Sequence, residues 1–166
     1  MRALKFIVGC LFLVGCAQEI VTTVPFSAEE VSFINRRGES TISGQAFMRQ
    51  NGGGIVTCAG LEVELVPAGQ YAVQRINGIY GSPQGGRNSL LTPPSIVNVP
   101  SEYLSMSKTT MCDADGDFEF PNIANGDYYV IVGIAWTVPG SYIPEGGTLA
   151  KLVQIRNGQS TRVILS

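Results

Sequence analysis

Two short apolar runs separated by an Asn-Gly step restrict the fold more than any other feature of this sequence. The first is Phe118-Glu119-Phe120, and the second extends from Tyr128 to Trp136. Aromatic and β-branched residues favour extended backbone, while glycine next to Asn or Asp favours the turns that join strands. The pattern predicts consecutive antiparallel strands at the centre of an all-β sandwich, each introduced by a Gly-Asp step.

The segment 41–49 alternates well enough to predict a first strand. Ile42 and Phe47 are its expected apolar anchors, and Gly44 is a candidate for a β-bulge. The strand expected next, before Pro67, has the clearest alternation in the chain. We expect its core face to be Leu61, Val63 and Leu65, opposite Glu62, Glu64 and Val66.

Two apolar runs near the carboxyl end, 149–155 and 160–165, flank the dipeptide Asn157-Gly158. Runs of this kind around an Asn-Gly step are a strong hairpin signal, so the two segments are predicted to pair with each other.

The length of 166 residues and the 45% hydrophobic content suit one globular domain with one core. The formal charge of -2 gives no electrostatic basis for binding DNA or RNA. The chain also contains no histidine, which removes the commonest general base, the commonest metal ligand and every Ser-His or Cys-His dyad. A nucleic acid is therefore not an expected partner, and a non-enzymatic protein is expected.

The amino-terminal residues have the pattern of an export signal. A short basic region is followed by an apolar run that is too short to cross a bilayer as a helix, and Leu13-Val14-Gly15-Cys16 then resembles the lipobox of bacterial lipoproteins. We expect residues 1–15 to be a signal peptide and Cys16 to be lipidated, although an ordinary signal peptide is the alternative. Because Ala17 stands where many inner-membrane lipoproteins have Asp, the outer membrane is the expected location.

Residues 16–38 are expected to form a lipidated tether before a sandwich domain at 39–166. Within this tether, Ser27 to Glu30 have the spacing of a capping box, which predicts a helical turn that packs Val31 and Ile34.

The long segment 68–109 interrupts the strand pattern with tyrosines, glycines and prolines. An irregular helix near residues 71–76 and an edge strand near 95–99 are expected within it. Loops on a rigid sandwich commonly carry recognition, so this insertion is the expected binding surface for an envelope protein or a glycan. Its candidate binding residues are Tyr71, Tyr80 and Tyr103. An insertion that only covers a sheet edge is the alternative.

Cys58 and Cys112 remain once Cys16 is lipidated and the signal peptide is removed. An even pair in an exported chain predicts a disulfide, and the absence of a CxxC motif argues against the alternative of a redox-active pair.

The acidic turn Asp113, Asp115, Asp117 places carboxylates at alternate positions around Gly116, as calcium loops do. The twelfth position of an EF-hand loop would fall on Ala124, so that motif is excluded and only a looser calcium site remains open. The alternative is a turn that uses Asp and Gly for backbone reasons alone.

Glu62 and Glu64 share a strand face, but a two-carboxylate hydrolase needs acids that face each other across a cleft, so a solvated face is the competing interpretation. Trp136 and Tyr142, together with the acidic turn, could instead serve a carbohydrate- or calcium-binding module of the cell surface.

The segment from Thr110 to Phe120, followed by Gly126-Asp127-Tyr128, resembles the carboxypeptidase regulatory-like domain, a transthyretin-like Greek-key sandwich of about seven strands. In that family the aromatic positions matched by Phe118, Phe120 and Tyr128 are core. The resemblance implies a non-catalytic module that stabilises, spaces or binds. It also implies a seven-stranded fold with a long insertion after the second strand.

Overall fold

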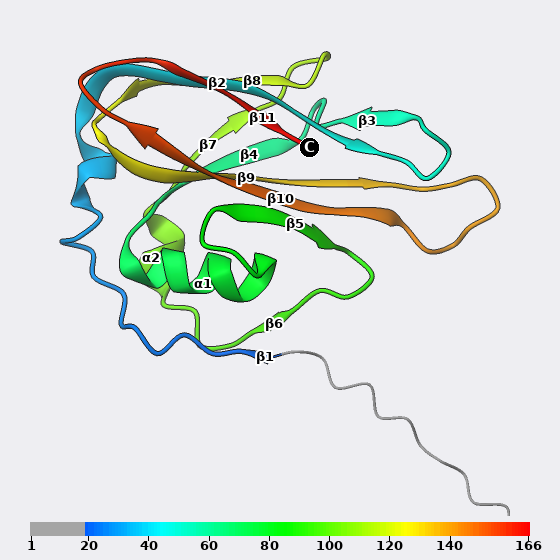
Figure 1. Cartoon of the computed structure of the whole chain (residues 1–166), viewed down its shortest axis with the longest axis horizontal. Helices are drawn as coiled ribbons and strands as arrows, with labels where there is room; N and C mark the ends of the chain where they lie inside the picture. Colours follow the sequence, from blue (N-terminus) through cyan, green and yellow to red (C-terminus); the bar gives the residue numbers. More distant parts are fainter. Residues whose placement is uncertain (1–18) are drawn as a thin grey trace, which may run out of the picture.

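The computed structural model describes residues 19–166, and strands are the main secondary structure of this range (Figure 1). The predicted signal peptide and the predicted lipidation site, Cys16, lie outside the described residues. Within 19–166, no helix is both long and apolar enough to cross a membrane. The elements in chain order are β1 (Glu19–Ile20), η1 (Ser32–Asn35), β2 (Arg37–Arg49), β3 (Ile55–Thr57), β4 (Glu62–Pro67), α1 (Gln70–Tyr80), β5 (Gly85–Ser89), β6 (Ser95–Ile96), α2 (Ser101–Ser105), β7 (Lys108–Met111), β8 (Asp117–Ile123), β9 (Gly126–Trp136), β10 (Glu145–Ile155) and β11 (Thr161–Leu165).

Two sheets face each other and confirm the predicted all-β sandwich. One has five antiparallel strands in the order β5-β10-β9-β4-β7. The other is built around β2, which pairs with β11 in parallel and with β8 and β3 in antiparallel orientation. The strands exceed the expected seven, partly because the insertion adds β5 and β6 and the preceding segment adds β1.

The main core lies between the two sheets. In β9, alternate residues Tyr128, Val130, Val132 and Ile134 point into it and are almost completely buried. The predicted core aromatics Phe118 and Phe120 join them from the opposite sheet. The period-2 pattern of strands therefore predicted this layer correctly.

The strand partners differ from the prediction at both Asn-Gly steps. β8 pairs with β2 rather than with β9, and β11 pairs with β2 rather than with β10. At each step the chain crosses from one sheet to the other, as Figure 1 shows for β8 and β9. The predicted hairpins are wrong because a turn signal specifies a change of direction and leaves the hydrogen-bonding partner open.

Three predicted side-chain positions also differ. Phe47 lies on the half-buried face of β2, opposite the face of Ile42, so it is not a core anchor. Gly44 pairs in regular register, and the irregularity in β2 lies between Arg37 and Ile42. A side chain at Gly44 would collide with Val163, which explains the glycine without a bulge.

Leu61 is 36% exposed and is not part of the core, because it precedes the first residue of β4. Val63 and Leu65 are fully buried between the sheets as expected. The opposite face of β4, with Glu62, Glu64 and Val66, does not simply meet solvent, since a third layer covers part of it.

The insertion forms this third layer. α1 packs on the outer face of the five-stranded sheet, and β5 extends that sheet by pairing with β10 (Figure 1). A second apolar cluster fills the space between helix and sheet; its buried members are Val66, Tyr71, Ala72, Ile76, Tyr103, Tyr129 and Ala150. The expected helix is therefore present, while the expected edge strand at 95–99 shortens to β6, which pairs with β1.

The part of the predicted tether that the structure describes packs against the domain. Ile20, Val31 and Ile34 are buried, the last two as predicted. The Ser27 hydroxyl oxygen accepts a hydrogen bond from the Glu30 amide at 3.3 Å, as the capping-box spacing predicted. This segment therefore contacts two layers: β1 pairs with β6 of the third layer, and Ile34 is part of the main core.

Candidate functional site

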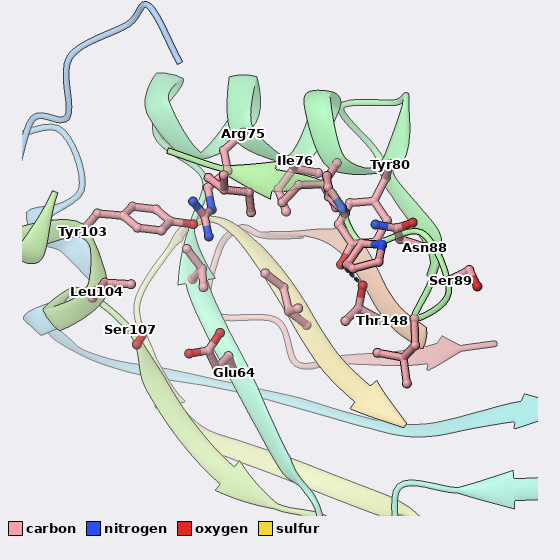
Figure 2. A pocket seen from close by; sticks show the side chains of 17 residues that line it. Glu64, Arg75, Ile76, Tyr80, Asn88, Ser89, Tyr103, Leu104, Ser107 and Thr148 are labelled. Carbon is pink, nitrogen blue, oxygen red and sulfur yellow. Dashed lines mark hydrogen bonds between the residues drawn. The ribbon is translucent and has the colours of Figure 1, made fainter. Parts of the chain in front are cut away.

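A cleft of about 310 Å³ lies between α1 and the outer face of the five-stranded sheet (Figure 2). This volume is at the lower end of the range for small-molecule sites. It is the space that the second apolar cluster leaves unfilled. Its lining residues come from β4, α1, β5, β9, β10 and the segments around α2, and they are Glu64, Val66, Arg75, Ile76, Ile79, Tyr80, Asn88, Ser89, Leu90, Pro93, Pro94, Ile96, Tyr103, Leu104, Ser107, Ile131 and Thr148.

The floor of the cleft is the outward face of three neighbouring strands. Glu64 and Val66 alternate on β4, and Ile131 and Thr148 come from β9 and β10. Because side chains alternate across a strand, these residues point away from the main core. The floor is therefore apolar in part, with a carboxylate and a hydroxyl at separate places.

The roof of the cleft is one face of α1. Arg75, Ile76, Ile79 and Tyr80 lie at the spacing that brings residues to the same side of a helix. The helix begins at Gln70, whose amide donates to the Glu30 carboxylate at 3.0 Å, and ends at Gly81, which adopts a left-handed conformation. The N-terminal segment thus helps to fix the helix that carries the roof.

Two opposite charges enter the cleft from opposite sides. In Figure 2, the Arg75 guanidinium descends from α1 beside Tyr103, while the Glu64 carboxylate rises from β4. The guanidinium carbon lies 5.2 Å from the centre of the Tyr103 ring, in a cation-π arrangement. Arg75 Nη1 is buried and has no hydrogen-bond partner among the described residues.

The Glu64 carboxyl is tuned by its surroundings. Partial burial raises its pKa, the nearby Glu62 adds to the rise, and Arg75 opposes it. Glu64 is the only acidic residue among those that line the cleft in the described part of the chain. The two-carboxylate hydrolase hypothesis therefore lacks its second acid here.

Two of the three predicted binding tyrosines line the cleft. The Tyr80 hydroxyl lies 3.0 Å from Thr148 Oγ1 in a hydrogen bond, and burial raises the pKa of Tyr80. Burial raises the pKa of Tyr103 to about 12. Both phenols are consequently neutral at physiological pH and offer a hydroxyl group next to an apolar ring.

Tyr71 does not line the cleft. It is buried behind Tyr103, with their ring centres 4.9 Å apart, and also contacts Phe26. It supports the Tyr103 ring from the side away from the cleft.

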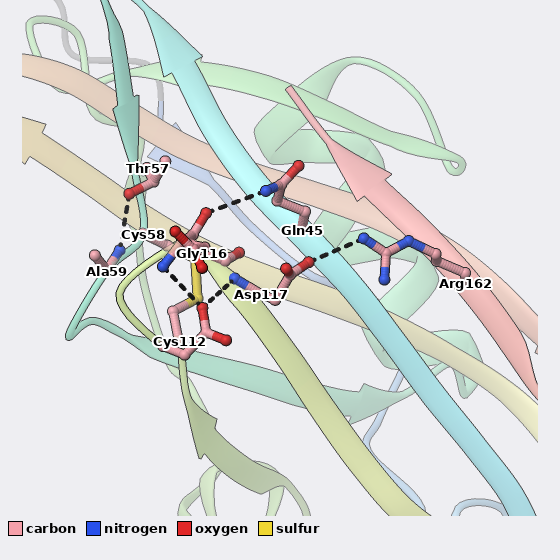
Figure 3. The surroundings of a disulfide bond; sticks show 10 residues. Gln45, Thr57, Cys58, Ala59, Cys112, Gly116, Asp117 and Arg162 are labelled. Carbon is pink, nitrogen blue, oxygen red and sulfur yellow. Dashed lines mark hydrogen bonds and ion pairs between the residues drawn. A yellow bond between two sulfur atoms is a disulfide. The ribbon is translucent and has the colours of Figure 1, made fainter.

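The acidic turn has a structural arrangement. The Asp113 carboxylate accepts hydrogen bonds from the amides of Asp115 and Asp117 at 3.0 and 2.9 Å. Asp117 also pairs with Arg162 at 2.9 Å (Figure 3). Within residues 19–166 no group of three acidic, Cys or His side chains is placed to hold a metal ion, so the three aspartates predicted for calcium do not converge.

The predicted disulfide between Cys58 and Cys112 is confirmed (Figure 3). The two Cα atoms are 5.7 Å apart, and both residues are buried. The bond joins the segment before β4 to the segment after β7, and the Gly60 amide donates to the Cys112 carbonyl beside it. It closes the base of the chain segment that contains the insertion.

Trp136 and Tyr142 are not brought together with the acidic turn. Trp136 lines a separate small pocket of about 160 Å³ with Arg49, Arg87 and Glu145. Tyr142 is fully exposed on the loop between β9 and β10. The acidic turn contacts the β2 sheet through Gln45 and Arg162 instead.

The placement of Glu64 and Arg75 in one cleft was not predicted from the sequence. The alternation around Glu64 predicts a solvated face, and nothing adjacent to Arg75 in the sequence predicts a cleft. The available signal was the position of Arg75, one residue before the buried Ile76 in α1. This signal can be used only when the helix and the face that it packs against the sheet are already known.

No protein-family model matches the chain, and no curated protein matches it. Among solved structures, the chain is similar to the crystal structure of a protein from Pseudomonas aeruginosa described as a putative carbohydrate binding protein. The similarity has a TM-score of 0.69 and 26% sequence identity, and it covers 84% of this chain and 96% of the other. The two proteins therefore share a β-rich fold over almost the whole domain.

Proposed function

We propose that this protein is a carbohydrate-binding module of the bacterial cell envelope, and that it binds a sugar in the cleft beneath α1. The observation that carries the proposal is the composition of the cleft. Hydrogen-bonding groups from four elements, Glu64 on β4, Arg75 on α1, Asn88 on β5 and Thr148 on β10, enter a cavity with mainly apolar walls.

A sugar requires both kinds of surface. Its ring carbons present C–H groups that pack on apolar and aromatic side chains, while its hydroxyls need donors and acceptors when they leave water. In the cleft, Tyr103, Ile131 and the Pro93-Pro94 pair provide the apolar surface. A volume of about 310 Å³ suits a ligand of one sugar ring with part of a neighbour.

The similarity to the Pseudomonas aeruginosa protein supports the same proposal, because the protein described as a putative carbohydrate binding protein has this fold over 96% of its length. The absence of histidine from the sequence and the single acid in the cleft favour binding without catalysis. We also propose that the domain is a member of the carboxypeptidase regulatory-like family, which the chain resembles most specifically at residues 110–128.

Attachment to the envelope through a lipid on Cys16 is a further part of the proposal, supported by the lipobox pattern at residues 13–16. Labelling cells with a tritiated fatty acid should label the protein, and Cys16→Ser should abolish the label. A Cys16→Ser protein that keeps the label would contradict lipidation at this residue.

The sugar-binding proposal is tested by applying the full chain to a glycan array with two matched tryptophan variants. Ser89 and Ser141 are both exposed serines whose hydroxyls accept a hydrogen bond from the amide two residues later. Only Ser89 lines the cleft. We expect Ser89→Trp to remove the array signals by filling the cleft, and Ser141→Trp to retain them.

Signals that survive Ser89→Trp would contradict the location in the cleft. An array with no signal for the unmodified chain would contradict the proposed function itself.

A second candidate function is docking to an envelope protein through the loop between β9 and β10. The observation that favours it is the exposure of Tyr142 and Ile143, which are 103% and 62% exposed at adjacent positions. A photo-crosslinking amino acid at position 142 in intact cells should give one discrete adduct, whereas the same group at Ser166 should not. Equal crosslinking at both positions would contradict this function.

A further inference from the structure

The cleft contains one positive and one negative group that do not neutralise each other directly. Arg75 and Glu64 face the same space from roof and floor (Figure 2). The ion pairs within 4 Å in the described part of the chain join Arg156 to Asp127 and Arg162 to Asp117, and neither involves this pair. A ligand between Arg75 and Glu64 would therefore meet both charges.

Arg75 holds an unused hydrogen-bond donor. Its Nη1 is buried without a partner, and its guanidinium is fixed by the cation-π contact with the Tyr103 ring. An arginine remains charged at every physiological pH, and a buried donor without an acceptor is costly. Because the Arg75 side chain lines the cleft, its guanidinium is suited to a ligand atom that accepts a hydrogen bond.

Glu64 has the opposite requirement. An ionised carboxylate only accepts hydrogen bonds, and no hydrogen bond from another described side chain engages the carboxylate of Glu64, which remains accessible to solvent. Glu64 is therefore suited to a ligand group that donates.

We infer that the cleft selects an uncharged sugar that presents two neighbouring hydroxyls, one accepting from Arg75 and the other donating to Glu64. The inference rests on the proposed function and specifies its ligand class. A hydroxyl both donates and accepts, so a pair of them satisfies both side chains. The carboxylate of an acidic sugar would be attracted to Arg75 but repelled by Glu64, and the ammonium of an amino sugar would be attracted to Glu64 but repelled by Arg75. Only a neutral sugar satisfies both side chains without a repulsion.

The test is calorimetric titration of the full chain with two matched series of sugars: glucose, glucuronic acid and glucosamine, and galactose, galacturonic acid and galactosamine. Within each series the members differ by one charged group. In at least one series we expect the neutral sugar to bind roughly tenfold more tightly than both charged members, a difference typical of one charged hydrogen bond. This comparison uses the unmodified chain and does not depend on how any variant folds.

Substitutions then reverse the preference. Glu64→Gln keeps the shape but removes the negative charge, so it should weaken the neutral sugar roughly tenfold and make the uronic acid the better ligand. Glu119→Gln is the matched control, because Glu119 is an exposed strand glutamate on β8 of the other sheet and does not line the cleft. It should leave the neutral-to-acidic ratio unchanged.

The outcomes separate this inference from the function on which it rests. Equal binding of neutral and charged sugars, or an unchanged ratio in Glu64→Gln, would overturn the inference. If array signals were nevertheless lost in Ser89→Trp, the proposed function would stand. Failure of all six sugars to bind, together with an empty array, would overturn both.

Discussion

The two faces of the five-stranded sheet carry two different apolar layers. On the inner face, Tyr128 packs into a core that is closed by the second sheet, and on the outer face the next residue, Tyr129, packs under α1. Both tyrosines are fully buried. Burial of the individual residues therefore does not distinguish the layers, and what differs is how completely each layer is covered.

The inner layer is covered by strands along its whole length and is joined by a disulfide. The outer layer is covered by the 11-residue helix α1, the five-residue helix α2 and connecting segments rich in glycine and proline. The two helices are too short to cover five strands, so part of the sheet remains as the floor of a cleft. The inner layer is therefore closed and fully packed, whereas the outer layer is incompletely covered and leaves a cleft beside its apolar cluster.

Loss of the disulfide should have the largest effect. We expect the double variant Cys58→Ala, Cys112→Ala to lower the free energy of unfolding by about 4 kcal/mol, because the bond constrains a long segment of the unfolded chain. Urea unfolding of the oxidised protein and the variant measures this difference. A loss below about 1 kcal/mol would show that the closed layer does not depend on the bond.

A matched pair of isoleucines compares the two layers directly. Ile134 and Ile76 are both almost completely buried, but only Ile76 borders the cleft. We expect Ile134→Ala to cost about 3 kcal/mol and Ile76→Ala about 2 kcal/mol, since the side chains around the cleft can move into the space. Equal losses in urea unfolding would contradict the difference in packing.

The adjacent tyrosines allow a finer comparison. The Tyr128 hydroxyl donates to the Ala124 carbonyl at 2.9 Å, and the Tyr129 hydroxyl donates to the Pro83 carbonyl at 2.6 Å. Replacing either tyrosine by Phe should cost about 1 kcal/mol. Only Tyr129→Phe should accelerate amide hydrogen exchange in residues 81–94, because Pro83 belongs to the outer layer. Faster exchange there in Tyr128→Phe instead would contradict the separation of the layers.

The smallest effect concerns Glu64. Its folded pKa is raised, so protonation favours the folded state, and the wild type should lose a little stability as the pH rises from about 4 through that raised value. In Glu64→Gln this loss should disappear. Relative to the wild type, the variant should therefore be more stable at neutral pH than at acidic pH. Because the side chain is solvent-accessible, the difference should be at most about 0.5 kcal/mol. Urea unfolding of both proteins at acidic and at neutral pH measures this difference in the free energy of unfolding. A variant that loses stability relative to the wild type as the pH rises would contradict the partly buried environment of Glu64.

The inner layer could be predicted from the sequence because it depends on local rules. Alternation in β9 placed Tyr128 and Ile134 on one face, and the cysteine count, together with the predicted export signal, predicted the Cys58–Cys112 bond. Strand pairing could not be predicted in the same way. The Asn157-Gly158 turn is local, but the partner of the strand that follows lies more than one hundred residues earlier.

The cleft was only partly predictable. The tyrosines of the insertion indicated where to look, and Tyr80 and Tyr103 do line the cavity. Glu64 could not be assigned, because its role depends on a helix that packs over β4 from another part of the chain. Alternation shows that Glu64 leaves the main core, but it does not show what lies on the other side.

The pairing of β11 with β2 has a consequence for how the protein is made. Thr161 lies opposite Ile42 and Leu165 opposite Ala46, so a loop of over one hundred residues must close before these hydrogen bonds form. Contacts of such high sequence separation slow folding. During synthesis, one edge of β2 therefore stays unpaired until β11 emerges, and in this period the chain is most exposed to aggregation.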